Sequence, residues 1–215
     1  MSRAALLRAA PLLSAGLVLG CGGSGPTELD FAIAVVELTP GEGAGFGQDR
    51  LPDLVLGPPR GAGLGAGSTD VLSLGVGGEI VLELGQDVID EPGPDLIVFE
   101  NAFVFGGTTF AEPAFVALSA DGVTFTELLC SPEVTGYPGC AGVSPVYANA
   151  ETNDIDPLDP DLAGGDAFDL ADFGLSTARY VRIRDAGIAA GPGGGTNEGF
   201  DLDAIAIIHG AGASP

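Results

Sequence analysis

The chain lacks the residues on which most enzyme and nucleic-acid-binding sites are built. It has no Trp, one His and 3 Cys, and its 7 basic residues are all arginine. A Ser–His–Asp triad or a zinc site would have to use His209, at the end of the last expected strand, so enzyme chemistry has little support. With 30 acids and a formal net charge of −23, the chain repels nucleic acid and anionic lipid.

Long hydrophobic runs are also missing, because the apolar run at residues 9–19 is too short to span a bilayer comfortably as a permanent helix. It follows Arg3 and Arg8 and ends in Val18-Leu-Gly-Cys21, which resembles the lipobox of bacterial lipoproteins. The resemblance implies a signal peptide over residues 1–20 and a lipid anchor on Cys21. With Gly22 in the following position it implies the outer membrane. The alternative is an ordinary secretory signal with an accidental cysteine.

The other two cysteines, Cys130 and Cys140, bracket a Pro- and Gly-rich loop. Once Cys21 is lipidated they form an even pair, and an oxidising envelope favours a disulfide between them. Two free buried thiols are the alternative. A redox-active pair is disfavoured, since the spacing is not Cys-x-x-Cys.

Short apolar and alternating runs separated by turn residues predict an all-β sandwich with no convincing long helix. We expect a tether over 21–29, one β-sandwich domain over 30–209 and a disordered tail over 210–215. The run at 95–99, apolar on both faces, predicts a central strand. The other expected strands are 31–38, 54–56, a hairpin of 71–74 with 79–84, a hairpin of 115–119 with 123–128 across an Asp-Gly turn, 178–184 and 199–208. One or two helical turns are expected within 164–173.

Three of these segments resemble the galactose-binding-like jelly rolls, a group that includes discoidin domains and many carbohydrate-binding modules. They are Ser119-Ala-Asp-Gly-Val-Thr-Phe125, Ala178-Arg-Tyr-Val-Arg-Ile183 and Phe200-Asp-Leu-Asp-Ala-Ile205. The last looks like the closing strand of calcium-containing modules of that group. The segments 99–103, 110–114 and 164–169 look like a set of bacterial cell-surface proteins of unassigned function. The resemblance implies a jelly-roll fold and a surface location.

Acidic and amide side chains gather where strands end. Glu100 and Asn101 follow the central strand, and Asp201 and Asp203 form an i, i+2 pair expected on one face of the last strand. Calcium prefers oxygen ligands, and a buried carboxylate without a partner is costly, so we expect a calcium site. A salt bridge to Arg182 or Arg184 is the alternative. Weaker candidate ligands are Asp95, Glu112, Asp166 and Asp169.

The sequence thus favours a non-catalytic, calcium-binding surface lipoprotein for adhesion or ligand binding, with glycans among the ligands considered. Its ligand-contacting residues would be Phe103, Phe105 and Tyr137. The alternative is a structural component of an envelope complex that binds basic proteins through its acidic face. A hydrolase that uses paired carboxylates, as glycosidases do, ranks third.

Overall fold

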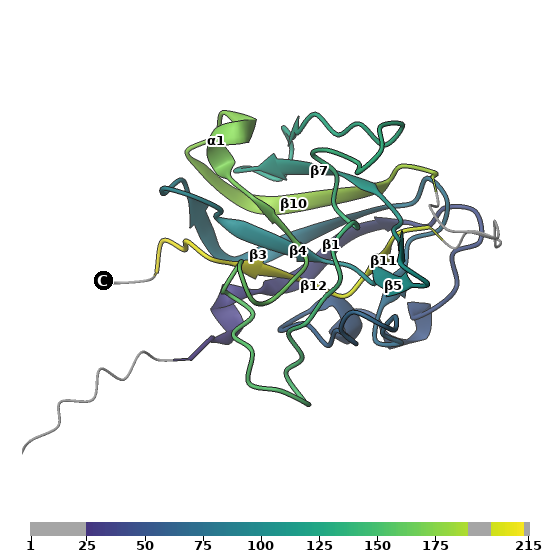
Figure 1. The fold of residues 1–215 in the computed structure, drawn as a ribbon. Helices are drawn as coiled ribbons and strands as arrows, with labels where there is room; N and C mark the ends of the chain where they lie inside the picture. The colour runs from purple at the N-terminus through teal and green to yellow at the C-terminus, as the bar shows by residue number, and fades with distance from the viewer. Residues whose placement is uncertain (1–24, 189–198, 213–215) are drawn as a thin grey trace, which may run out of the picture.

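The computed structural model describes residues 25–188 and 199–212, and it shows two antiparallel β-sheets stacked as a sandwich (Figure 1). In spatial order, the larger sheet consists of β1 (Ala32–Thr39), β3 (Glu79–Ile89), β10 (Thr177–Asp185), β7 (Ala114–Ser119) and β8 (Thr126–Glu127). The smaller sheet consists of β12 (Ala204–Ile207), β4 (Leu96–Phe99) and β9 (Asp166–Phe168). The prediction of an all-β sandwich is confirmed.

Two short strand pairs and a few helical turns complete the fold. β11 (Asp201–Leu202) pairs with β2 (Leu72–Ser73), and β5 (Phe103–Phe105) pairs with β6 (Thr108–Phe110). The helical turns are α1 (Leu170–Phe173) and three 3-10 turns, η1 (Glu28–Asp30), η2 (Gln48–Arg50) and η3 (Asp53–Val55). No helix in the described part of the chain is long and apolar enough to cross a membrane.

The main core lies between the two sheets. The larger sheet contributes Leu82, Leu118 and Val181, and the smaller one contributes Val98 and Ile205, all with essentially no solvent exposure. Because side chains alternate along a strand, the other face of the larger sheet carries charged residues instead. Its ion pairs include Arg184 with Glu127.

The strand β4 is buried on both faces, as its sequence predicts. Val98 faces the main core, whereas Ile97 and Phe99 face a second apolar cluster that includes Phe31 and Val146. β4 lies between β12 and β9, with which it pairs in antiparallel register. Asp95 and Glu100, which directly flank this strand, are buried as well.

Several expected elements differ in the structure. Residues 71–74 and 79–84 do not form a hairpin, because β2 pairs with β11 while β3 pairs with β1 and β10. Residues 54–56 are not a strand, since η3 covers most of them. The hairpin of β7 and β8 is present, but β8 is limited to two residues because Asp121 holds the turn by accepting from the backbone N–H groups of Val123 and Thr124.

Both ends of the described chain contact the sandwich. At the N-terminal side, Asp30 accepts from the backbone N–H of Thr27 and from Gln86, so part of the expected tether is held against the domain. At the C-terminal side, Gly210 pairs with Val88 and the N–H of Ala211 donates to Asp87 O, so the expected tail is held against β3 as far as Gly212. The expected signal peptide and Cys21 lie outside the described residues. The disulfide between Cys130 and Cys140 is present.

Candidate metal centre

Acidic side chains flank β4 at both of its ends, and each end carries a separate cluster. Asp95 precedes the strand and Glu100 follows it, and both are buried, with 0% and 2% of their surface exposed. A buried carboxylate is costly unless a proton, a hydrogen-bond donor or a cation compensates it. Asp95 and Glu100 differ in how many hydrogen-bond donors compensate the buried carboxylate.

Glu100 is the buried carboxylate that the described residues do not fully compensate. Its Oε2 atom is inaccessible to solvent and has no hydrogen-bond partner among the described residues, and the same holds for Oδ1 of Asn101. Two neighbouring side chains therefore each have a buried oxygen atom that no described donor contacts. Buried polar atoms in native proteins are nearly always satisfied, so these oxygens call for a bound species that accepts lone pairs.

Three further carboxylates from distant parts of the chain lie close enough to Glu100 to raise its pKa. Asp166 lies opposite Val98 in the β4–β9 pairing, so its side chain is on the same face as that of Glu100. Asn101 Nδ2 donates to Asp201 Oδ2 at 3.3 Å, which ties the end of β4 to β11. Glu112 follows β6, and its N–H donates to Gly142 O beside the segment that holds Asp166. We call Glu100, Asn101, Glu112, Asp166 and Asp201 the Glu100 cluster.

The electrostatics of this cluster are unfavourable without a positive charge. Burial raises the pKa of Glu100 well above 4.5, and the negative charges of Asp201, Glu112 and Asp166 raise it further. Burial also raises the pKa of Asp166, against the opposing effect of the Val143 N–H, which donates to its Oδ2 at 2.8 Å. Both shifts have the direction expected for carboxylates that lack a counter-ion.

The chemistry of the Glu100 cluster fits a hard cation. All of its potential donor atoms are carboxylate or amide oxygens, which suit calcium, whereas zinc prefers nitrogen and sulfur. Of the cluster, Asp166 also lines a pocket of about 260 Å³ together with Ser144 and Asp172. Arg182 and Arg184, the alternative counter-ions, instead pair with Glu79 and Glu127 on the charged face of the larger sheet.

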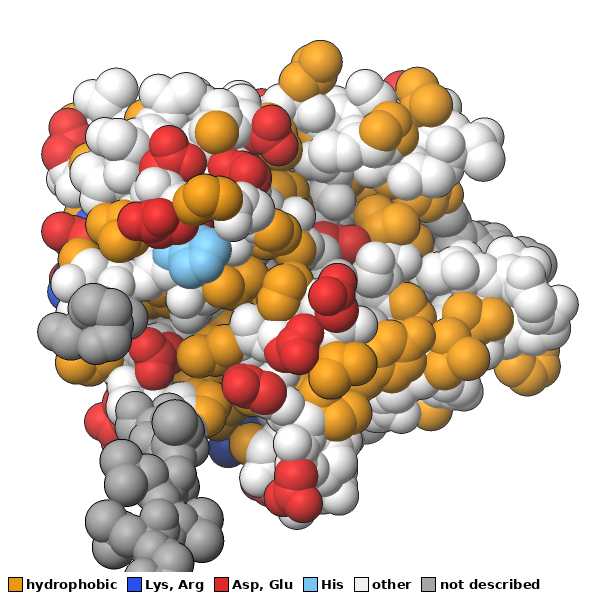
Figure 2. Space-filling view, turned by 60° about the vertical axis from the view of Figure 1, so that its left-hand side comes forward, with side chains coloured by type: hydrophobic (Ala, Val, Ile, Leu, Met, Phe, Trp, Pro, Cys, Tyr) orange, Lys and Arg blue, Asp and Glu red, His pale blue; other side chains and the backbone are white. Residues whose placement is uncertain are grey.

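The second cluster lies at the other end of β4. Asp90, Asp95 and Asp169 each offer a carboxylate oxygen, and these atoms lie within 4.8 Å of one another, so the three residues can hold a metal ion. Figure 2 shows the nearby histidine, His209, at the surface among acidic side chains on a face with few basic ones. Asp90 was missed by the sequence analysis because it lies in what looked like a plain acidic turn; its proximity to the start of β4 was the available signal.

Asp95 already has protein partners on both of its oxygens. Oδ1 accepts from the Glu91 N–H at 3.1 Å and contacts His209 Nδ1 at 2.8 Å, and Oδ2 accepts from the Leu170 N–H at 2.8 Å. Asp169 caps α1 by accepting from the Ala171 N–H. This second cluster therefore has a structural role of its own, and its need for a cation is smaller than that of the Glu100 cluster.

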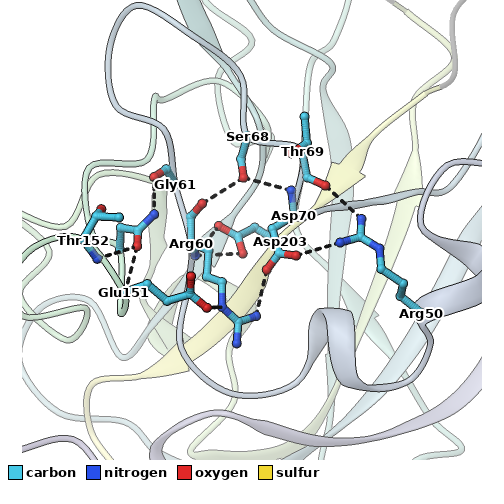
Figure 3. A network of polar contacts seen from close by, with 10 residues as sticks. Arg50, Arg60, Gly61, Ser68, Thr69, Asp70, Glu151, Thr152 and Asp203 are labelled. Carbon is cyan, nitrogen blue, oxygen red and sulfur yellow. Dashed lines mark hydrogen bonds and ion pairs between the residues drawn. The ribbon is translucent and has the colours of Figure 1, made fainter.

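Asp203 is held by a different segment from the Asn101 that donates to Asp201. Both of its oxygens accept from the backbone N–H of Arg60, at 3.1 and 2.9 Å, within the network shown in Figure 3. Burial raises the pKa of Asp203 to about 8 although the Arg60 hydrogen bond opposes the shift. β11 ends before Asp203 and β12 begins after it, so the two acids do not lie in one continuous strand, and their action as a pair stays a prediction.

The three aromatic residues expected to contact a ligand belong to two different segments. Phe103 stacks on Phe110 with ring centroids 4.8 Å apart, and Phe105 is 69% exposed at the end of β5. Tyr137 is half-buried in the loop closed by the disulfide, where its φ of 49° is unusual for a non-glycine residue. An apolar pocket of about 380 Å³ lies elsewhere, lined in part by Phe31 and Ile155.

Comparisons with known proteins add no family assignment. No protein-family model matches this chain, and no curated protein matches it at a significant level.

Proposed function

We propose that this chain is a non-catalytic, calcium-binding β-sandwich module, carried on the bacterial cell surface by a lipid on Cys21, where it serves adhesion or ligand binding. The observation that carries the proposal is the buried Oε2 of Glu100, which has no partner among the described residues and lies among carboxylates from three other segments. A calcium ion there would satisfy Glu100 and offset the mutual repulsion of its neighbours.

The surface location has separate support. The lipobox-like sequence before Cys21 is the primary argument, and the disulfide between Cys130 and Cys140 fits a chain that matures in an oxidising envelope. The strands at 178–183 and 200–205, which resemble galactose-binding-like jelly rolls, form β10 and the β11–β12 segment. We therefore propose the jelly-roll variant of the sandwich.

Thermal unfolding of the full chain in calcium and in chelator tests the cation site. At a calcium concentration about 100 times Kd, binding contributes about 2.7 kcal/mol, which raises the Tm of a domain of this size by about 5–10 °C. Magnesium should do less, since it demands a stricter octahedral geometry and gives up water reluctantly. No shift with calcium would refute the proposal.

Two matched variants locate the site. Glu100→Gln and Asp90→Asn both replace a carboxylate with an amide of similar shape, but in different clusters. We expect Glu100→Gln to abolish the calcium-dependent shift and Asp90→Asn to retain it. The reverse result would assign the ion to the Asp90, Asp95 and Asp169 cluster and overturn the assignment to Glu100.

A further inference from the structure

The residues of the Glu100 cluster stand at both ends of a hairpin. Strands β5 and β6 form a two-stranded ribbon, which together with its flanking residues spans 102–111 and which we call the arm. Glu100 and Asn101 directly precede the arm, and Glu112 directly follows it. A single ion bound by these residues would therefore join the two ends of the arm.

The arm is anchored at its base, where Ala102 and Ala111 are buried, whereas its tip is more exposed. Its strands pair only with each other in the described sheets, and Phe103 stacks on Phe110 within it at an interplanar angle of 6°. One backbone bond, from Val104 N to Leu64 O at 2.6 Å, ties it to a neighbouring loop. An isolated two-stranded hairpin is marginally stable in water, so the geometry at its base decides whether it stays ordered.

The charges at that base act in opposite directions with and without an ion. In the cation-free chain, the negative charges of Glu112 and Asp201 face the buried Glu100, and they favour separation of the segments when Glu100 is ionised. A bound divalent ion would reverse this repulsion and close the loop at its base, so that the arm would lose less entropy when its strands pair. The Asn101 to Asp201 hydrogen bond would add a link to β11, at the same end of the sandwich as β5 in Figure 1.

We propose that cation binding at the Glu100 cluster orders the arm and thereby controls how Phe105 is presented at the surface. This inference rests on the proposed function and adds a regulatory consequence to it. The arm contains no charged residue in a chain of net charge −23, and Phe105 is 69% exposed. Linkage makes the coupling reciprocal. If the ion raises the affinity of the arm for a molecule that binds only the ordered arm, that molecule raises the affinity of the cluster for the ion by the same factor.

Hydrogen exchange on the full chain, with calcium and with chelator, tests the inference. We expect the paired amides of β5 and β6 to exchange at least about tenfold more slowly in calcium, as expected when local opening is suppressed. The amides of Val123 and Thr124, held by Asp121 in the β7–β8 turn, should be unchanged and serve as an internal reference. Glu100→Gln should lose the response of the arm, and Asp90→Asn should keep it.

The possible failures are distinguishable. If calcium raises the Tm of the wild-type chain but exchange in the arm changes less than about twofold, the cation site stands and its control of the arm is refuted. If Asp90→Asn removes the response of the arm, the control does not come from the Glu100 cluster. If calcium changes neither the Tm nor the exchange, the proposed function itself fails.

Discussion

The buried acids of this protein differ in how each one is compensated. Asp185 accepts from the backbone N–H groups of Gly77, Gly187 and Phe200, and Asp95 and Asp203 likewise accept from backbone donors. These hydrogen bonds replace the water that each carboxyl loses on folding. Glu100 has one oxygen with no partner among the described residues. Burial alone therefore gives no support to a cation site, whereas the buried, unmet acceptor of Glu100 supports the proposed one.

Asp203 provides a test of this distinction between compensated and uncompensated acids. Asp203→Asn keeps an oxygen that accepts from the Arg60 N–H and resembles the neutral carboxyl favoured by the pKa of about 8. We expect a small loss of stability, less than about 1 kcal/mol, because the hydrogen bond persists. Asp203→Ala leaves that N–H without its acceptor and should cost about 1–3 kcal/mol. Urea unfolding in chelator measures both losses.

Both Asp203 variants should still gain stability when calcium is added. Asp203 makes its hydrogen bonds with Arg60, whereas the Glu100 cluster is tied to β11 through Asp201. A calcium response that disappears in Asp203→Asn would show that this residue is a ligand and would support the pairing with Asp201 that the sequence suggests. The sequence alone could not separate the two residues, because an i, i+2 spacing places them on one face only if a single strand runs through both.

Among the elements, β4 was the most predictable from sequence. Its four consecutive apolar residues require burial on both faces. The acids that flank it mark the two ends of the strand, where acidic residues from other segments lie nearby. The partners of β2 were not predictable in the same way. A glycine-rich turn at 75–78 suggests a hairpin, but that turn instead packs against residues 41–44, with Gly41 N donating to Leu74 O. Strand pairing here follows the packing of distant segments, which local turn residues do not encode.

The loop closed by the disulfide leads directly into the segment that contacts two of the proposed ligands. Cys140 adjoins Ala141, which bridges to Ala114, and the next two residues supply Gly142 O for Glu112 and Val143 N–H for Asp166. These short links make the position of two candidate ligands depend on the conformation of residues 140–143. The dependence was visible only once the fold was known, since Glu112 and Asp166 are far apart in sequence.

Replacing both Cys130 and Cys140 with serine should therefore have two effects. Opening a loop with a sequence separation of 10 is expected to cost about 3 kcal/mol in the chain-entropy model. The calcium affinity should also fall, because Asp166 and Glu112 are held less firmly, and calorimetric titration of the folded variant measures this. As a control, Ser131→Ala leaves the disulfide intact and should change neither quantity. An unchanged affinity in the double variant would show that the loop does not position the ligands.

Over the whole molecule, negative charge exceeds positive charge so far that the arginines cannot balance it. Every arginine in the described part pairs with at least one acid: Arg50, Arg60, Arg179, Arg182 and Arg184. The remaining acids repel one another across the surface, which lowers the stability of the compact state. Composition predicted this repulsion, but it could not show that the carboxylates cluster at the two ends of β4.

Monovalent salt separates this general repulsion from specific binding at Glu100. In chelator, raising NaCl from about 0.05 to about 0.5 M shortens the screening length severalfold and should raise the Tm of the wild-type chain and of Glu100→Gln by similar amounts. Surface charges are screened in both proteins, because the substitution removes only a buried acid. Calcium at millimolar concentration adds little screening, so its effect should appear in the wild type and be absent from Glu100→Gln. If calcium instead stabilised both proteins equally, it would be acting on the surface charge as a whole, and the buried oxygen of Glu100 would not be its ligand.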